Sequence, residues 1–266
     1  MGGNKPISSP NLIWKVYTMP LIQTERGGLW VADHRRINEP PFLLIHGAGG
    51  THLDWGMPIR KLSNFAPDLN GHGRSHGDGH LSLTDHADDL AALLDALDIQ
   101  KIHVVGHSMG GGIALTLALN HPDRVAGLGL IATGARLKVH PDILTRAESQ
   151  PEAVAELLSR WLWGGSVDDA VRERGKSQFM TLKPSIIARD YAASNVFDAR
   201  ARLGDIRAPT LVLCGTEDVM TPPKFSDSLA TSIAGARLRL FEGAGHMLQI
   251  ERGTEVAATL LELSLP

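Results

Sequence analysis

Short apolar runs alternate with helical patterns along most of the chain, and this alternation predicts its architecture. Runs of four to seven residues rich in Val, Ile, Leu and Phe, each ended by polar or glycine residues, predict strands. These strand candidates are residues 13–18, 28–34, 42–45, 102–105, 125–131, 210–214 and 237–241, with a weaker one at 65–66.

Helices are predicted between these strands. Leu90, Leu93, Leu94 and Leu97 recur at a spacing that places all four on one helical face, and Thr84 is the expected cap of that helix. Residues 111–119 are apolar on all sides, which indicates a buried helix, and further helices are expected at 223–233 and 255–263. Strands alternating with helices predict an α/β fold, with a mostly parallel sheet covered on both faces.

One segment interrupts the alternation. Residues 137–202 contain no convincing strand, but they carry an apolar stripe at helical spacing and prolines where helices can begin. The stripe is Val154, Leu157, Leu158, Trp161 and Leu162, and the prolines are Pro141, Pro151 and Pro184. We therefore expect a helical cap of three or four helices at 137–202, inserted into an α/β core formed by residues 1–136 and 203–266.

Composition and charge narrow the class of protein. The 266 residues carry 26 Lys and Arg against 29 Asp and Glu, a formal net charge of −3, which gives no electrostatic case for a nucleic-acid partner. Cys214 is the only cysteine, so the chain has neither an internal disulfide nor a cysteine-built metal site. With no apolar run of about 18 residues and no apolar core of a secretion signal, we expect a soluble, cytoplasmic protein without a membrane span.

The clearest chemical signal is Gly106-His107-Ser108-Met109-Gly110, between the strand at 102–105 and the apolar helix from 111. In that context the pattern G-x-S-x-G predicts a nucleophile elbow, a tight turn that holds the serine in a strained conformation at the carboxyl edge of the sheet. The second match, Gly73-Arg74-Ser75-His76-Gly77, lies in a polar loop without a preceding buried strand or a following apolar helix. Ser108 is therefore the expected nucleophile, and Ser75 is not.

A serine nucleophile needs a base, and the base needs an orienting acid. Asp218 follows the strand at 210–214, and His246 follows the strand at 237–241 in a glycine-flanked loop. Ser108, Asp218 and His246 thus stand in the chain order expected of this architecture, with Glu217 as the competing acid.

Taken together, these motifs resemble the α/β-hydrolase family over nearly the whole chain. The resemblance also rests on His46-Gly47-Ala48-Gly49-Gly50 and on the loop from Asp68 to Ser75. It implies an oxyanion hole formed by the backbone N–H groups of Ala48 and Met109. The sequence departs from the family pattern between Trp55 and Asp68, where only 12 residues leave little room for a helix and a full fourth strand.

Two other groups of residues invite a functional interpretation. His72, His76 and His80 recur every four residues, followed by Asp85, His86, Asp88 and Asp89, but the glycines between the first three argue against a helical metal site. No metal and no cofactor are therefore expected. Trp161 and Trp163 are predicted to line the mouth of a pocket under the cap, with the equally supported alternative that Trp161 fills the core of the cap at helical spacing.

These residues predict a serine esterase that cleaves small-molecule carboxylic esters of short to medium acyl chains through an acyl-enzyme on Ser108. Serine at the elbow argues against the dehalogenase and epoxide-hydrolase branches of the family, whose nucleophile is a carboxylate. Monoacylglycerol lipases, lactonases and carbon–carbon bond hydrolases have similar elbows and remain alternatives. A ligand-binding sensor with residual turnover is the alternative from another class, because a fold does not fix a function.

Overall fold

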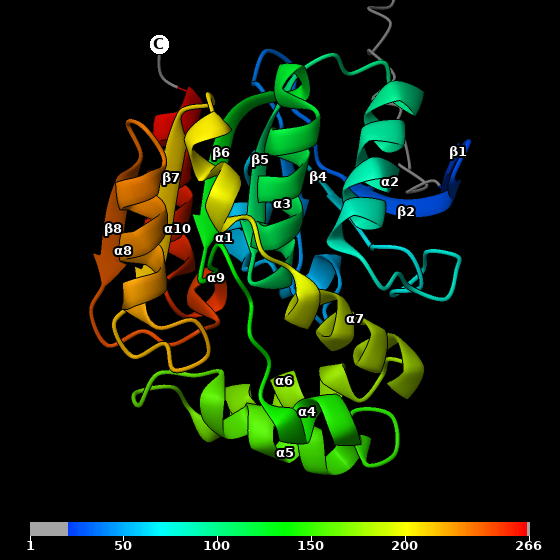
Figure 1. Cartoon of the computed structure of the whole chain (residues 1–266), viewed down its shortest axis with the longest axis vertical. Coiled ribbons are helices and arrows are strands. Elements are labelled where there is room, and N and C mark those ends of the chain that lie inside the picture. The colour runs from blue at the N-terminus through cyan, green and yellow to red at the C-terminus, as the bar shows by residue number, and fades with distance from the viewer. Residues whose placement is uncertain (1–20, 265–266) are drawn as a thin grey trace, which may run out of the picture.

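The computed structural model describes residues 21–264, which form one eight-stranded sheet with helices on both faces (Figure 1). The strand order is β1-β2-β4-β3-β5-β6-β7-β8; β2 is antiparallel to β1 and β4, and the other neighbours are parallel. The strands are β1 (Leu21–Thr24), β2 (Gly27–Asp33), β3 (Phe42–Ile45), β4 (Asn64–Pro67), β5 (Ile102–His107), β6 (Val125–Ile131), β7 (Thr210–Gly215) and β8 (Arg237–Phe241). The predicted α/β fold with a mostly parallel sheet is confirmed.

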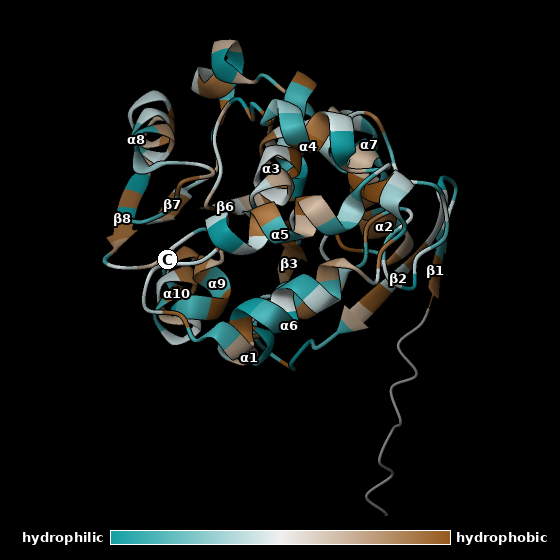
Figure 2. Cartoon of the chain, turned by 90° about the horizontal axis from the view of Figure 1, so that it is seen from below, coloured by the Kyte–Doolittle hydropathy of each residue, from teal (hydrophilic) through white to brown (hydrophobic). Residues whose placement is uncertain are grey.

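Alternate residues of each central strand face two separate apolar layers, because successive side chains of a strand point to opposite faces. Leu43 packs in one layer and Leu44 in the other, both fully buried. The first layer lies under α2 (Leu83–Ala96), α3 (Met109–Asn120) and α8 (Pro223–Ser232), and the second under α1 (Met57–Arg60), α9 (Leu248–Glu251) and α10 (Gly253–Leu260). Figure 2 shows the two helical layers on either side of the sheet. Burial on both faces explains why these strands read as continuous apolar runs.

Four further helices lie between β6 and β7 in the chain and gather at one end of the sheet (Figure 1). They are α4 (Pro141–Arg146), α5 (Pro151–Trp161), α6 (Asp169–Phe179) and α7 (Pro184–Val196), and prolines begin α4, α5 and α7 as the sequence predicted. Ile143, Leu158 and Phe179 belong to their own apolar cluster, separate from the two layers of the sheet. We refer to α4–α7 as the cap; the domain boundaries at 137 and 202 remain a prediction.

Several local details differ from the sequence-based expectations. The 12 residues before Asp68 do accommodate a fourth strand, β4, because the helix before it, α1, has only four residues. Ser82, rather than Thr84, caps α2, and its hydroxyl accepts a hydrogen bond from the Thr84 amide at 3.1 Å. The edge strand β1 was not predicted, and the strand expected at 13–18 lies outside the described residues.

Short 3-10 turns complete the described chain: η1 (His52–Asp54), η2 (Pro122–Arg124), η3 (Arg200–Asp205) and η4 (Leu261–Ser264). Within residues 21–264, none of the helices combines the length and the apolar character needed to cross a bilayer.

Candidate active site

Ser108 stands at the junction between β5 and α3 in the conformation expected of a nucleophile elbow. Its φ of 53° and ψ of −118° are rare for a residue with a side chain. The turn is fixed on both sides, since the Ser108 amide donates to the Ile131 carbonyl at 3.0 Å and the Thr133 hydroxyl donates to the Ser108 carbonyl at 2.7 Å. The predicted strained turn at the carboxyl edge of the sheet is therefore present.

Two glycines allow this turn because backbone segments approach each other closely there. A Cβ atom on Gly106 would overlap the backbone of Gly110, and one on Gly110 would overlap the carbonyl oxygens of Ile45 and His46. The beginning of α3 is thus packed directly against the end of β3. Any side chain at either glycine would push the serine away from the sheet edge.

Asp218 and His246, from the loops after β7 and β8, meet in a buried hydrogen bond. The Nδ1 atom of His246 lies 2.9 Å from Oδ2 of Asp218, and both residues are 2% exposed. Thr221 joins them, because its hydroxyl donates to the same carboxylate oxygen at 2.7 Å and lies 3.2 Å from Nδ1 of His246. With Nδ1–H directed at Asp218, the Nε2 atom of His246 is left to act as an acceptor.

The environment of Asp218 keeps its carboxyl group ionised. Burial alone would raise the pKa of Asp218, but the facing His246 ring and hydrogen bonds from His246 and Thr221 outweigh it and hold that pKa below its ordinary value. The amides of Met220 and Thr221 donate to the other carboxylate oxygen, each at 2.9 Å. A buried carboxylate with this many donors is suited to orienting an imidazole.

His107, within the elbow, supports the backbone of His246. Its Nε2–H donates to the His246 carbonyl at 2.9 Å, and the two rings lie 4.9 Å apart. Burial and the neighbouring His246 ring lower the pKa of His107 to about 3, so this ring is neutral. His107 therefore positions the candidate base without competing with it for protons.

Ser108 and His246 both line a cavity of about 530 Å³ between the cap and the end of the sheet. Its walls are mostly apolar and include Ile143, Trp161 and Phe225. Trp161 also packs against the apolar cluster of the cap, so both interpretations of this residue hold, whereas buried Trp163 lines a smaller adjoining cavity of about 90 Å³.

The loop after β3 brings Ala48 beside Ser108, and both residues line the two cavities. Within residues 21–264, the backbone N–H groups of Ala48 and Met109 donate to no other group. Two unused amides next to a candidate nucleophile are the arrangement that an oxyanion hole needs.

The cap fixes this loop through Asp190 on α7. One oxygen of Asp190, Oδ2, accepts from the Gly49 amide and from Nε2 of His72, both at 2.8 Å. Nδ1 of His72 donates to the Asn70 carbonyl at 3.0 Å, so both ring nitrogens carry a proton. Burial opposes charge on His72, but the adjacent carboxylate outweighs it and raises the pKa of His72, while that of Asp190 is lowered. A buried ion pair therefore joins cap, loop and core.

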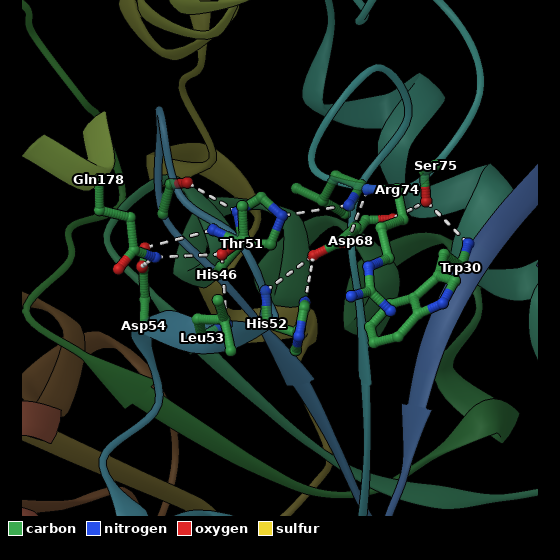
Figure 3. Close-up of polar contacts among 12 residues, drawn as sticks. Trp30, His46, Thr51, His52, Leu53, Asp54, Asp68, Arg74, Ser75 and Gln178 are labelled. Carbon is green, nitrogen blue, oxygen red and sulfur yellow. Dashed lines mark hydrogen bonds and ion pairs between the residues drawn. The ribbon is translucent and has the colours of Figure 1, made fainter. Parts of the chain in front are cut away.

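A second polar network also holds the loop after β3 (Figure 3). Gln178 on α6 donates to Asp54 at 2.8 Å and to Thr51 at 3.2 Å. Asp68, after β4, accepts from the backbone and the ring of His52 at 2.9 and 2.8 Å, and from the Arg74 amide at 3.0 Å.

The competing sequence candidates have other partners. Ser75 donates to the Asp68 carbonyl at 2.6 Å and accepts from the Trp30 amide at 2.8 Å, so it braces a loop (Figure 3). Glu217 accepts from the Gly165 amide at 2.6 Å. His80 pairs with Asp89 at 2.8 Å, and no cluster suited to holding a metal ion occurs among the residues that the structure describes.

The model of the alpha/beta hydrolase family matches residues 42–259, which include the elbow, the candidate acid Asp218 and the candidate base His246. The chain belongs to the alpha/beta hydrolase family. It is therefore a hydrolase of this fold, as the resemblance of its motifs implied.

Individual members of the family differ in the bond that they cleave. The chain is 29% identical to the 2-hydroxymuconate semialdehyde hydrolase of Pseudomonas sp. strain CF600, over 82% of this chain and 84% of that protein. A thermophilic esterase from Thermogutta terrifontis matches with a TM-score of 0.81 and 27% identity, covering 91% and 96% of the two chains. The enol-lactonase of Burkholderia xenovorans, at 24% identity and a TM-score of 0.86 over 92% and 99%, shares the fold.

Sequence reasoning missed Thr221, His107 and Asp190 as parts of this site. Thr221 had only a general local signal, since an Asp side chain in a turn accepts hydrogen bonds from the backbone amides that follow it. Asp190 had no such signal, because its partners lie 118 and 141 residues away in the chain.

Proposed function

We propose that this hydrolase cleaves carboxylic esters of short to medium acyl chains through an acyl-enzyme on Ser108. The observation that carries the proposal is the shared cavity: Ser108 and His246 both face it, while Asp218 occupies the opposite nitrogen of the His246 ring. A nucleophile, a base and an orienting acid thus meet at an apolar cavity large enough for a small ester.

In this mechanism, Nε2 of His246 takes the proton of Ser108 as the serine oxygen attacks the ester carbonyl. The tetrahedral intermediate collapses to an acyl-enzyme, and the alcohol leaves with the proton held by His246. Water, deprotonated by the same ring, then releases the acid. Asp218 stays ionised throughout and stabilises the imidazolium, a role that its lowered pKa supports.

Ala48 and Met109 are the proposed oxyanion hole. Their free amides adjoin Ser108, and each such donor contributes about 3 kcal/mol to transition-state stabilisation in serine hydrolases. The ion pair of Asp190 holds the residue after Ala48, which limits movement of this donor.

Hydrolysis of p-nitrophenyl esters from acetyl to palmitoyl tests the proposal. We expect turnover that peaks at short or medium chains, and a loss of at least about 10⁴-fold in Ser108→Ala. Ser75→Ala is the matched control, because Ser75 occupies the second G-x-S-x-G pattern but has hydrogen-bonding partners within the fold. Folded Ser75→Ala should retain turnover, and an active Ser108→Ala protein would refute the assignment.

The 29% identical hydrolase of 2-hydroxymuconate semialdehyde supports a second candidate, carbon–carbon bond cleavage by the same three residues. A folded protein that leaves every aryl ester intact but cleaves such a semialdehyde would replace the first proposal with the second.

A further inference from the structure

Positive charge gathers on the lining of the large cavity. Lys138, at the start of the segment leading into the cap, and Lys224, in the first turn of α8, both line it with exposed side chains. His140 lines it too, and no Asp or Glu is among the described residues of this lining. Within residues 21–264, neither lysine is paired with a carboxylate. The lining therefore offers two cations without a carboxylate partner, of which Lys224 lies over the Phe225 ring at 5.7 Å, and no competing anion.

A second, independent observation comes from Ser194 on α7. Ser194 is one of the residues that line the same cavity and is only 4% exposed, and its buried hydroxyl has no hydrogen-bond partner among the described residues. Leaving a buried hydroxyl without a partner costs about 1–3 kcal/mol. Thr116 shows the ordinary solution on α3, where its hydroxyl donates to the Gly112 carbonyl at 2.9 Å. An unpaired hydroxyl in a cavity wall points to a polar atom of a ligand.

We infer that the substrate is an anionic ester, with one negatively charged group on an otherwise apolar skeleton. Lys138 and Lys224 attract the charged group at the opening of the cavity, and the Ser194 hydroxyl donates to a substrate oxygen inside it. The apolar walls around Ile143 and Phe225 hold the skeleton. This inference rests on the proposed esterase function and adds the charge of the substrate to it.

Two pairs of substrates test the charge preference, one for each side of the ester bond. On the acyl side, the p-nitrophenyl monoester of adipic acid is compared with its methyl ester. On the alcohol side, 4-carboxyphenyl butanoate is compared with its methyl ester. We expect kcat/KM for the anionic member of one pair to exceed that of the neutral member by about tenfold. The preference should shrink as ionic strength rises, because both lysines are exposed to solvent.

Lysine variants test whether Lys138 and Lys224 cause the preference for the anionic ester. Lys138→Gln combined with Lys224→Gln should lower kcat/KM for the preferred anionic ester by about tenfold and leave the neutral ester unchanged. Lys101→Gln is the matched control: it removes the same charge from an exposed lysine before β5, at the opposite end of that strand from Ser108. This control variant should change kcat/KM for neither the anionic nor the neutral ester.

The variant Ser194→Ala distinguishes a role of the hydroxyl in substrate binding from a role in stabilising the fold. Because the hydroxyl is unpaired in the free protein, its removal should leave the melting temperature unchanged or slightly higher, while KM for the preferred ester rises about fivefold. A melting temperature that falls with KM unchanged would show that Ser194 only supports the fold, and would overturn its part in the inference.

The failures of the two proposals are distinguishable. Equal hydrolysis of both members in both pairs would refute the charge preference and leave the esterase function intact. If no ester is turned over, the proposed function fails, and the charge preference is then decided by calorimetric binding of monomethyl adipate and dimethyl adipate to the wild-type protein. Equal affinity for the two would refute it.

Discussion

Apart from Ser108, Asp218 and His246 themselves, Thr221 is the residue on which the geometry of the candidate triad depends most directly. Its hydroxyl donates to the same oxygen of Asp218 that receives Nδ1–H of His246. Thr221→Val keeps the shape of the side chain but removes this donor. We expect kcat/KM to fall roughly tenfold, equivalent to about 1.4 kcal/mol for a hydrogen bond to a charged acceptor, with KM little changed.

Steady-state kinetics on a p-nitrophenyl ester measure this effect, and Thr221→Ser is the control that restores the hydroxyl. The serine variant should keep most of the activity. If the valine variant were as active as the wild type, the orientation of His246 would not depend on the Thr221 hydroxyl.

At the scale of elements, the contact between α3 and the end of β3 fixes the position of the nucleophile. In Gly110→Ala the new methyl group would meet the carbonyl oxygens of Ile45 and His46, which belong to backbone that cannot move aside cheaply. We expect a loss of about 2 kcal/mol or more in the free energy of unfolding. Denaturation by urea measures this loss.

Gly112→Ala, two residues further along α3, is the matched control. The atoms nearest to its new methyl group would be the ends of the Leu83, Leu137 and Phe197 side chains. In a helix interior, alanine is more favourable than glycine by about 1 kcal/mol. The free energy of unfolding of this variant should stay within about 1 kcal/mol of the wild type. Similar losses in both variants would argue against a special role for the approach of β3.

The same elements show how far the sequence determines the structure. Residues 102–111 are locally consistent, since an apolar strand, a glycine-flanked serine and an apolar helix follow one another, and the elbow could therefore be predicted. The edge strand β1 has only four residues and none of them is fully buried, so it lacks the apolar run that marks the central strands. The cap of α2 is Ser82, two residues before the predicted Thr84, and a displacement of this size is typical of helix boundaries predicted from sequence.

The cap contacts could not be predicted for a different reason. Helical periodicity predicts that α7 has an apolar face, but not which residue of the core meets it. Asp190 contacts Gly49 and His72 only because the cap is placed over the end of the sheet, and a buried carboxylate within an apolar pattern gives no sign of its partner. Long-range polar pairs of this kind decide how the loop of Ala48 is held.

At the scale of the whole molecule, the ion pair of His72 and Asp190 links cap stability to pH. Both residues are fully buried. The pKa of His72 is raised above its ordinary 6.5, so its stabilising contribution is complete below pH 6.5 and is lost as pH rises through the raised value. The pKa of Asp190 is lowered below 3.8, so its contribution is complete above pH 3.8 and is lost as pH falls through the lowered value.

Both stabilising contributions are complete between about pH 4 and pH 6.5. Asp190→Asn should therefore lower the free energy of unfolding most within that range. Leaving His72 buried without its carboxylate should cost about 3 kcal/mol at pH 5.5, and less towards pH 9, because the wild type loses the charge of His72 as the pH rises through its raised pKa. Asp88→Asn is the control, since Asp88 pairs with His121 at 3.1 Å where both side chains are about one third exposed, and it should cost less than about 1 kcal/mol. Unfolding free energies of the three proteins at both pH values measure the difference. A cost of Asp190→Asn that stays constant or grows towards pH 9 would mean that His72 and Asp190 are held together by hydrogen bonding and not by charge.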